Sequence, residues 1–307
     1  IEMSLDNFEQ EIFLIQTQES IVIDPNISFQ DAKNKTHDLV LDSVRSRSVA
    51  DVPLGTFLSG GVDSSVVSLA LSEQIQGKID TFSVGFEKKS FDETDKSRTV
   101  AKLINSNHHE FIISINDLKG NLDEILLNFD EPFADSSSLP TYLVANKTRQ
   151  HVKVALTGDG GDEIFGGYNK YYIGKMNERY SKLISKNLHD SIKGVANKIL
   201  STKDDKRGNR FKVRKLINAI NYEGDFYFNI ISLAFQGEDI SQLLKKDWIK
   251  TGIFDFYKDR IENKAETLTD FRKIDKILSL EGDMLVKVDR TSMLTSLESR
   301  APFLNKK

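Results

Sequence analysis

Two glycine-rich segments constrain the fold of this chain more than any other feature of the sequence. Seven of the 18 glycines fall in residues 59–65 (SGGVDSS) and residues 157–168 (TGDGGDEIFGGY). Each segment follows a short apolar run, and we interpret both runs as buried β-strands. Glycine allows a positive φ and lets backbone N–H groups converge on an anion, and a helix directly after the first segment adds the positive end of its dipole. The pattern predicts a strand–loop–helix unit that binds phosphate at residues 60–65.

Strand and helix patterns alternate over the first half of the chain. Strands are predicted at 54–58, 79–86, 110–115 and 152–157, and helices at 28–47, 64–76, 92–104, 116–129 and 141–149. Such alternation predicts βαβ units, and hence a doubly wound α/β fold with a parallel sheet of about five strands. In that architecture a ligand binds at the carboxyl ends of the strands.

The remainder of the chain has a different pattern. The apolar runs at 12–15 and 21–23 indicate a strand-bearing lead-in, whereas helix periodicity dominates after residue 172, at 175–200, 210–219, 226–235 and 273–288. We therefore divide the chain into a lead-in with the first helix (1–50), an α/β core (51–172) and a mainly helical region (173–307). The helical region is expected to complete a cleft with the core.

Composition excludes several classes of function. The 307 residues include no cysteine, so disulfides, thiolate metal sites and a cysteine nucleophile are excluded, and a cytoplasmic location is the default. No window reaches the about 18 uninterrupted apolar residues of a membrane span. The net charge of −4 argues against binding of nucleic acid by the chain as a whole.

The first glycine-rich segment contains a carboxylate where phosphate is expected. It lacks the Gly-Lys-Ser/Thr ending of a Walker loop and does not match Gly-x-Gly-x-x-Gly. Asp63 would repel a phosphate unless a divalent cation lay between them, so its presence predicts Mg²⁺. Asp162, at the end of the neighbouring predicted strand, is the candidate for a second carboxylate ligand.

Five motifs in this order carry a resemblance to a known family. They are DVPLGTFLSGGVDSS (51–65), TFSVGF (81–86), DEPFADSSSLPTY (130–142), TGDGGDEIFGGY (157–168) and KVDRTSMLTSLESRAPFL (287–304). The first resembles the pyrophosphate-binding loop of the ATP pyrophosphatases, which have an adenine-nucleotide hydrolase-like fold. Together the five resemble the synthetase domain of the glutamine-dependent asparagine synthetases.

The resemblance implies a set of site residues. Those that would bind ATP and its pyrophosphate are Phe57, Leu58, Ser59, Gly60, Gly61, Asp63, Ser64, Ser65, Val84, Thr157 and Gly158. Asp63 and Asp162 would bind Mg²⁺. Asp159 matches an acidic residue associated with formation of the acyl adenylate, although many members have glutamate there. Leu58 and Val84 are equally explained as strand core.

Further matching residues border the expected substrate cleft. They are Asp130, Glu131, Asp135, Ser136, Ser137, Lys287, Asp289, Arg290, Glu298 and Arg300. Asp and Ser in the 130–137 segment are also ordinary turn residues. Lys287 to Arg300 are predicted to lie in a helix and its exit, where Glu298 and Arg300 equally suit a structural ion pair.

The resemblance implies that the side-chain carboxylate of aspartate attacks the α-phosphorus of ATP, that pyrophosphate leaves, and that ammonia attacks the activated carbon to give asparagine. In the family an N-terminal glutaminase domain supplies the ammonia with an amino-terminal cysteine, and a lysine beyond the Pro302–Leu304 match stabilises the transition state. Neither has a match here, so we expect a piece of a longer protein. The sequence leaves a homodimer open.

Two other functions remain open at this point. A relative that amidates another carboxylic acid, such as a sugar uronic acid or a β-lactam precursor, would carry the same motifs. A nucleotide-binding module without catalytic activity is the alternative from another class. RNA modification through the same loop is disfavoured by the net charge of −4.

Overall fold

The computed structural model describes residues 2–3, 10–11, 24–87, 92, 94–200, 208–222, 243–245 and 268–305. The chain divides into two units, residues 1–39 and 40–307. In the first unit, β1 (Glu2–Met3) pairs antiparallel with β2 (Gln10–Glu11). Helix α1 (Phe29–Arg47) begins there and continues into the second unit. The predicted strands at 12–15 and 21–23 lie outside the described residues.

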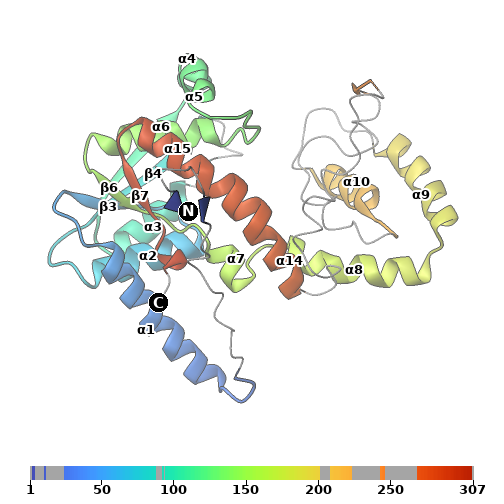
Figure 1. Cartoon of the computed structure of the whole chain (residues 1–307), viewed down its shortest axis with the longest axis horizontal. Coiled ribbons are helices and arrows are strands. Elements are labelled where there is room, and N and C mark those ends of the chain that lie inside the picture. Colours follow the sequence, from blue (N-terminus) through green and yellow to red (C-terminus); the bar gives the residue numbers. More distant parts are fainter. Residues whose placement is uncertain are drawn as a thin grey trace. The chain divides into compact units, whose positions relative to one another are not determined.

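A five-stranded parallel sheet forms the centre of the second unit (Figure 1). Its strands are β3 (Leu54–Phe57), β4 (Asp80–Phe86), β5 (Asn107–Ile113), β6 (Val154–Leu156) and β7 (Glu298–Arg300). They lie in the order β5-β4-β3-β6-β7, and every neighbouring pair is parallel. The predicted α/β fold with a parallel sheet of about five strands is confirmed.

The fifth strand was not predicted, because its three residues have no apolar alternation. Its pairing with β6 is parallel, and the Thr157 N–H donates to the Arg300 carbonyl at 2.8 Å. The Arg300 guanidinium donates to the carbonyl oxygens of Arg47 and Val49, both at 2.8 Å, and pairs with Glu298 at 2.8 Å. Arg300 therefore connects the edge strand to the end of α1.

Helices cover both faces of the sheet. They include α2 (Val62–Ser72), α3 (Thr94–Leu103) and α6 (Ser138–Arg149). Adjacent residues of β6 point to opposite faces. Leu156 packs with Val67 and Leu71 of α2, whereas Ala155 packs with Ala145 of α6. The sheet is thus buried on both sides, as a parallel sheet requires.

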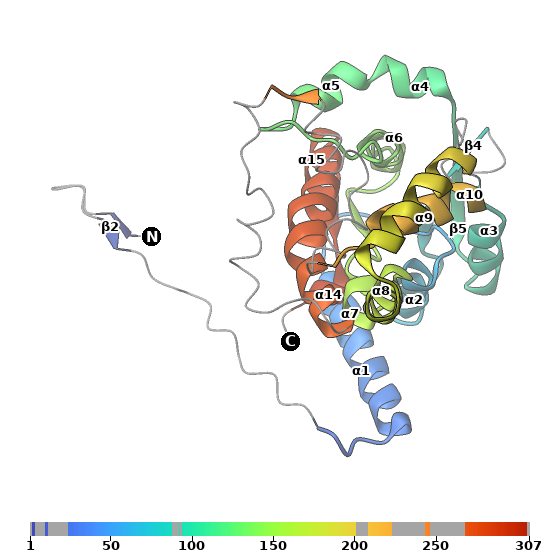
Figure 2. The same cartoon turned by 90° about the vertical axis from the view of Figure 1, so that its right-hand side faces the viewer.

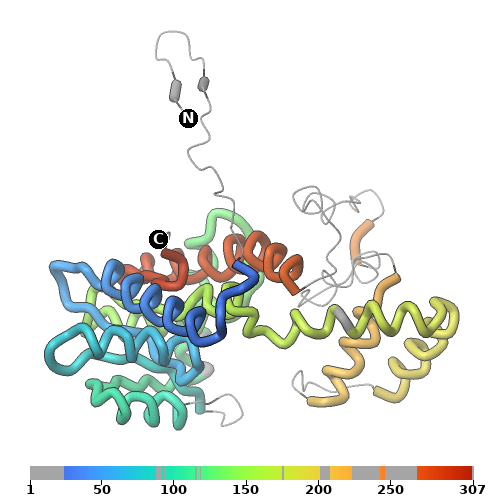
Figure 3. The backbone as a smooth tube through the Cα atoms, turned by 90° about the horizontal axis from the view of Figure 1, so that it is seen from below, coloured from blue at the N-terminus to red at the C-terminus, as the bar shows by residue number. Residues whose placement is uncertain are grey.

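Two of the predicted helices are broken in the structure. The helix predicted at 116–129 is divided at Asn121 into α4 (Ile115–Gly120) and α5 (Leu122–Leu127), which follow one another in Figure 2. The helix predicted at 175–200 is divided into α8 (Lys170–Leu183) and α9 (Lys186–Ile199), because Ile184 takes an extended conformation. Figure 3 traces the chain from α8 through α9 to α10 (Asn209–Ala219), the predicted 210–219 helix. The helix predicted at 226–235 lies outside the described residues.

One continuous helical stretch near the end of the chain carries residues to the sheet. It consists of α14 (Leu268–Asp275), a π-helical segment η3 (Lys276–Leu285) and α15 (Val286–Leu294), drawn in red in Figure 1. Helix α15 packs against α6 and is followed by β7 and the short helix η4 (Pro302–Leu304). The prediction of a helix at 273–288 is confirmed. Among the described residues, no helix has the length and apolarity that crossing a membrane requires.

Candidate active site

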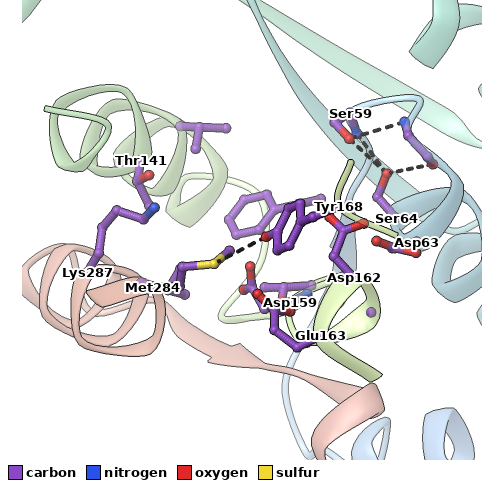
Figure 4. A pocket seen from close by; sticks show the side chains of 18 residues that line it. Ser59, Asp63, Ser64, Thr141, Asp159, Asp162, Glu163, Tyr168, Met284 and Lys287 are labelled. Carbon is purple, nitrogen blue, oxygen red and sulfur yellow. Dashed lines mark hydrogen bonds between the residues drawn. The ribbon is translucent and has the colours of Figure 1, made fainter. Parts of the chain in front are cut away.

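A pocket of about 420 Å³ lies at the carboxyl ends of β3 and β6, where the sheet topology places a ligand. Its walls come from the loop after β3, from the start of α2, and from the loop that joins β6 to α7 (Gly161–Phe165). Helices α6 and α15 and the end of η3 close the opposite side, as Figure 4 shows. Segments from both halves of the chain therefore meet at one pocket.

About half of the predicted site residues line this pocket. They are Phe57, Ser59, Gly61, Asp63, Ser64, Thr157, Gly158, Asp159, Asp162 and Lys287. The lining residues that the sequence analysis did not single out are Thr141, Val144, Gly160, Gly161, Glu163, Tyr168, Met284 and Val288. Six of these stand inside the quoted motifs, so their position in the motifs was the available signal. Val144 and Met284 had no signal beyond helix periodicity.

The phosphate-loop residues form a compact turn before α2. Gly60 has φ of +80°, and a Cβ there would lie 2.6 Å from the Ser97 backbone nitrogen, so only glycine fits without strain. Gly61 is the N-cap of α2, and no side chain caps this helix end. The hydroxyl oxygens of Ser59 and Ser64 lie 3.0 Å apart, and Ser65 donates its hydroxyl to the Gly61 carbonyl at 2.6 Å. Such an open helix end favours an anion.

Two acidic side chains face each other in the pocket. Burial raises the pKa of Asp63, and the charge of Asp162 raises it further; burial also raises the pKa of Asp162. A Cβ on Gly161 would lie 2.5 Å from the Asp63 carboxyl carbon, so glycine is what admits this carboxylate. Two facing carboxylates suit a hard divalent cation. Among the described residues no group of three ligating side chains gathers, so Mg²⁺ here would draw its other ligands from phosphate and water.

Asp159 lies in the same pocket, on the loop after β6 (Figure 4). Burial raises its pKa, while a hydrogen bond with Thr157 and the charge of Lys287 lower it. The net shift is upward. Lys287 projects from α15 on the other side of the pocket, so a bound molecule would lie between the side chains of Asp159 and Lys287.

Lys287 also fixes the loop that precedes α6. Its Nζ donates to Asp135 Oδ2 at 3.0 Å and to Ser137 Oγ at 2.9 Å. Burial alone would raise the pKa of Asp135, but hydrogen bonds from Ser137 and the charge of Lys287 outweigh it and hold the pKa below its usual range. The 130–142 motif and the 287–304 motif therefore meet through an ion pair.

Replacing Lys287 by methionine is expected to lower the free energy of unfolding at pH 7 by about 1–3 kcal/mol, because Asp135 loses its charged partner. The folded-state pKa of Asp135 is depressed, so its stabilising contribution is present above the ordinary carboxyl pKa and is lost as the pH falls through the folded value. Urea unfolding at several pH values should show a higher free energy of unfolding for the wild type than for the variant at pH 7. This difference should become smaller below about pH 4. A constant difference across this range would contradict the assignment.

The remaining predicted residues lie away from the pocket lining. Leu58 is fully buried and donates its N–H to the Phe82 carbonyl at 2.7 Å, and Val84 packs on the buried cluster that contains Ile113. Asp130 pairs with Arg290. Glu131, Ser136 and Asp289 are exposed, and Glu298 and Arg300 form the ion pair beside β7.

Comparison with known proteins points in one direction. Residues 35–307 match the family model described as asparagine synthase. A Bacillus subtilis protein named glutamine-hydrolysing asparagine synthetase 1 is 30% identical over 89% of this chain and 42% of its own length.

Two further relatives are provisionally named glutamine-hydrolysing asparagine synthetases. That of Mycobacterium tuberculosis is 34% identical over 86% of this chain and 39% of its own length. That of Methanocaldococcus jannaschii is 35% identical, over 84% and 48% respectively. The chain thus spans less than half the length of these curated relatives.

Proposed function

The chain belongs to the asparagine synthase family, and on that premise we propose that it is an ATP-dependent ligase that adenylates the side-chain carboxylate of aspartate and forms the amide with ammonia. The relatives' names include glutamine hydrolysis. We assign that step to the part of those relatives that this chain does not match.

One observation carries the proposal. The two glycine-rich loops, which are about 100 residues apart in sequence, come together at adjacent strand ends and place the open end of α2, the Asp63 and Asp162 carboxylates, and Asp159 around one pocket. Open backbone donors beside paired carboxylates fit a polyphosphate with a divalent cation. Asp159 and Lys287 supply acidic and basic groups next to it.

In the proposed reaction an aspartate carboxylate oxygen forms a bond to the α-phosphorus of ATP, and the bond from that phosphorus to the β-phosphate bridging oxygen breaks. The β- and γ-phosphates then leave as pyrophosphate. Ammonia next forms the C–N bond, the C–O bond to AMP breaks, and protons leave the nitrogen. Mg²⁺, when bound, would supply charge to stabilise the leaving pyrophosphate.

The chain's own residues would orient these groups. Residues 59–65 would hold the phosphates through backbone donors and hydroxyls, and Asp63 and Asp162 would hold Mg²⁺. Lys287 would keep the 135–137 loop in position beside the substrate through its ion pair with Asp135. Preorganised groups of this kind supply most of the rate enhancement in phosphoryl and acyl transfer, since little reorganisation remains when charge develops.

ATP–pyrophosphate exchange with a panel of carboxylic acids tests the proposal. We expect exchange that requires Mg²⁺ and L-aspartate. Exchange that requires a uronic acid or another acid instead would replace aspartate as the substrate while retaining the ligase. ATP binding without exchange for any acid would overturn the ligase proposal in favour of a nucleotide-binding module.

A further inference from the structure

Helix α7 carries Asp162 to the pocket, and it is too short to be stable by itself. It consists of the five residues Gly161–Phe165 and follows the loop after β6. Isolated helices shorter than about 12 residues are marginal in water. The last carbonyl oxygens of any helix have no partner inside it and need donors from elsewhere. The contacts that supply these donors to α7 therefore decide where Asp162 lies.

Arg272 of α14 supplies two of these donors. Its Nε donates to the Glu163 carbonyl at 2.8 Å, and its Nη2 donates to the Ile164 carbonyl. The planar guanidinium holds its N–H groups in a fixed fork, which suits two successive carbonyl oxygens. The Asp162 carbonyl accepts from the Gly166 N–H at 2.8 Å. The carbonyls of residues 162–164 are thus satisfied, and two of them depend on a side chain 109 residues away in sequence from Glu163.

The C-terminal turn of α7 also contacts the Asp162 carboxylate. A Cβ on Gly167 would overlap with Asp162 Oδ1, so glycine is what lets this side chain lie against the turn. The Gly167 N–H donates to the Asp162 carbonyl at 3.0 Å. Figure 4 shows the Asp162 carboxylate beside Asp63, whose pKa it raises. A movement of this turn would therefore displace one of the two carboxylates proposed to bind Mg²⁺.

Helix α14 is itself well anchored, so the Arg272 side chain extends from a fixed support. The helix packs against both α7 and α8, and Figure 1 shows it beside them. Asp275 of α14 is fully buried, and its Oδ2 lies 2.6 Å from the Nζ of Lys170 at the start of α8. Phe271 is buried too, and a Cβ on Gly174 of α8 would overlap with its ring. The contacts on either side of Arg272 thus fix the helix from which it reaches α7.

We propose that Arg272 is a positioning residue for the divalent cation, because it fixes the C-terminal end of α7 and thereby the Asp162 carboxylate. This inference rests on the proposed function, since it concerns the metal ligands of the same pocket. Arg272 is not among the residues that line the pocket, so it acts through α7 and not by contact with a substrate. Residues that hold metal ligands in place change metal affinity by about 10- to 100-fold when they are replaced.

Binding of Mn²⁺ to the full chain, without nucleotide, tests the proposal, and the electron paramagnetic resonance signal of the free ion measures it. Arg272→Met keeps an unbranched stem beside Gly166 and removes both donors, so it should raise the Kd for Mn²⁺ about tenfold. Arg272→Lys keeps the charge without the fork and should raise the Kd by a smaller factor. Asp162→Asn should weaken binding at least as much as Arg272→Met. An unchanged Kd in Arg272→Met, or the absence of an Asp162-dependent Mn²⁺ site in the wild type, would overturn the proposal.

Lys273→Met is the matched control. Lys273 is the next residue of α14, is exposed, and loses the same positive charge in this variant. Its Kd for Mn²⁺ should equal that of the wild type. The loss of a positive charge by itself favours a bound cation, so weaker binding in Arg272→Met has the opposite sign to a simple charge effect. An equal rise of the Kd in Lys273→Met and Arg272→Met would count against a specific role of Arg272.

Amide hydrogen exchange separates a loss of position from a loss of the fold. The Gly166 and Gly167 amides, which donate to the Asp162 carbonyl, should exchange at least ten times faster in Arg272→Met than in the wild type. The amides of β3, at the centre of the sheet, should exchange at the wild-type rate. Unchanged exchange at residues 166 and 167 would contradict the proposal. Equal acceleration at β3 would mean that Arg272 supports the whole fold and not this turn alone.

Kinetics then separate this inference from the proposed function. If ATP–pyrophosphate exchange supports the ligase, Arg272→Met should raise the half-saturating Mg²⁺ concentration about tenfold, while exchange at saturating Mg²⁺ changes by a much smaller factor. An unaltered Mg²⁺ requirement would leave the ligase in place and refute the role of Arg272. If the wild type shows no acid-dependent exchange but Arg272→Met still weakens Mn²⁺ binding, the positioning role stands and the ligase proposal fails.

Discussion

Asp63→Asn is expected to lower Mg²⁺-dependent ATP–pyrophosphate exchange on the order of 100-fold while leaving the protein at least as stable as the wild type at pH 7. Asn keeps the size of the side chain but removes one of two facing carboxylate charges. With Asp162 alone, the pocket holds a divalent cation less tightly, and the β- and γ-phosphates lose charge neutralisation.

The sign of the stability change follows from the pKa of Asp63. Burial and Asp162 raise this pKa above the ordinary value, so the folded state binds a proton more readily than the unfolded state. The ionised carboxylate therefore opposes folding at pH 7, and Asn removes this penalty. Urea unfolding without Mg²⁺ should show equal or higher stability, and the gain should disappear where Asp63 is protonated in both states.

Asp123→Asn is the matched control for this variant. Asp123 is an exposed residue in the first turn of α5 and lies outside the pocket lining. Its replacement should leave exchange unchanged. Full exchange activity in Asp63→Asn would remove the divalent-cation site from the proposal, and a large loss of stability would mean that Asp63 is structural.

Gly161→Ala should lower ATP–pyrophosphate exchange by about 10- to 100-fold, because the added methyl group displaces the side chain of Asp63. The added Cβ would lie 2.5 Å from the Asp63 carboxyl carbon and 2.8 Å from each of its oxygens. These atoms belong to a short side chain that is able to rotate away, so the fold is kept and the carboxylate moves. When both are measured on this variant, the unfolding midpoint should change little and the exchange rate should fall strongly.

Two other glycines provide contrast. Gly158→Ala places its Cβ 2.8 Å from the Ser64 backbone nitrogen, which has less freedom to move, so it should lower stability as well as activity. Gly194 is within α9 and has nothing within 4 Å of such a Cβ. Gly194→Ala should therefore raise the free energy of unfolding by about 0.5–1 kcal/mol with unchanged activity. Equal behaviour of Gly161→Ala and Gly194→Ala would show that the approach of Gly161 to Asp63 has no functional role.

The sequence predicted the parts of the site whose chemistry is local. A glycine-rich turn and a carboxylate within seven residues, 59–65, have few explanations, and the strand before them placed the turn at one end of the sheet. The parallel sheet followed from alternating periodicities. For Leu58 and Val84 the sequence did not separate a role in binding ATP from packing in the strand core, because an apolar residue at the end of a strand suits both.

The parts of the site that the sequence did not predict depend on contacts between segments that lie far apart in the chain. Met284 and Val288 reach the pocket only because the helical stretch from α14 to α15 packs against α6. Lys287 and Asp135 were both noted, but not their pairing, since 152 residues separate them. Glu163 sits inside a quoted motif, yet only its burial in the folded protein distinguishes it from the acidic residues around it.

The position of β7 has a consequence for the order in which the protein is made. Strand β6 is complete at residue 156, but its second neighbour begins at Glu298, so the ribosome must synthesise about 140 further residues before that edge is covered. During this interval β6 presents unpaired N–H and carbonyl groups to other chains. Nascent chains that pause before residue 298 are thus expected to depend on chaperones, and codon changes that slow this stretch should increase aggregation without altering any amino acid.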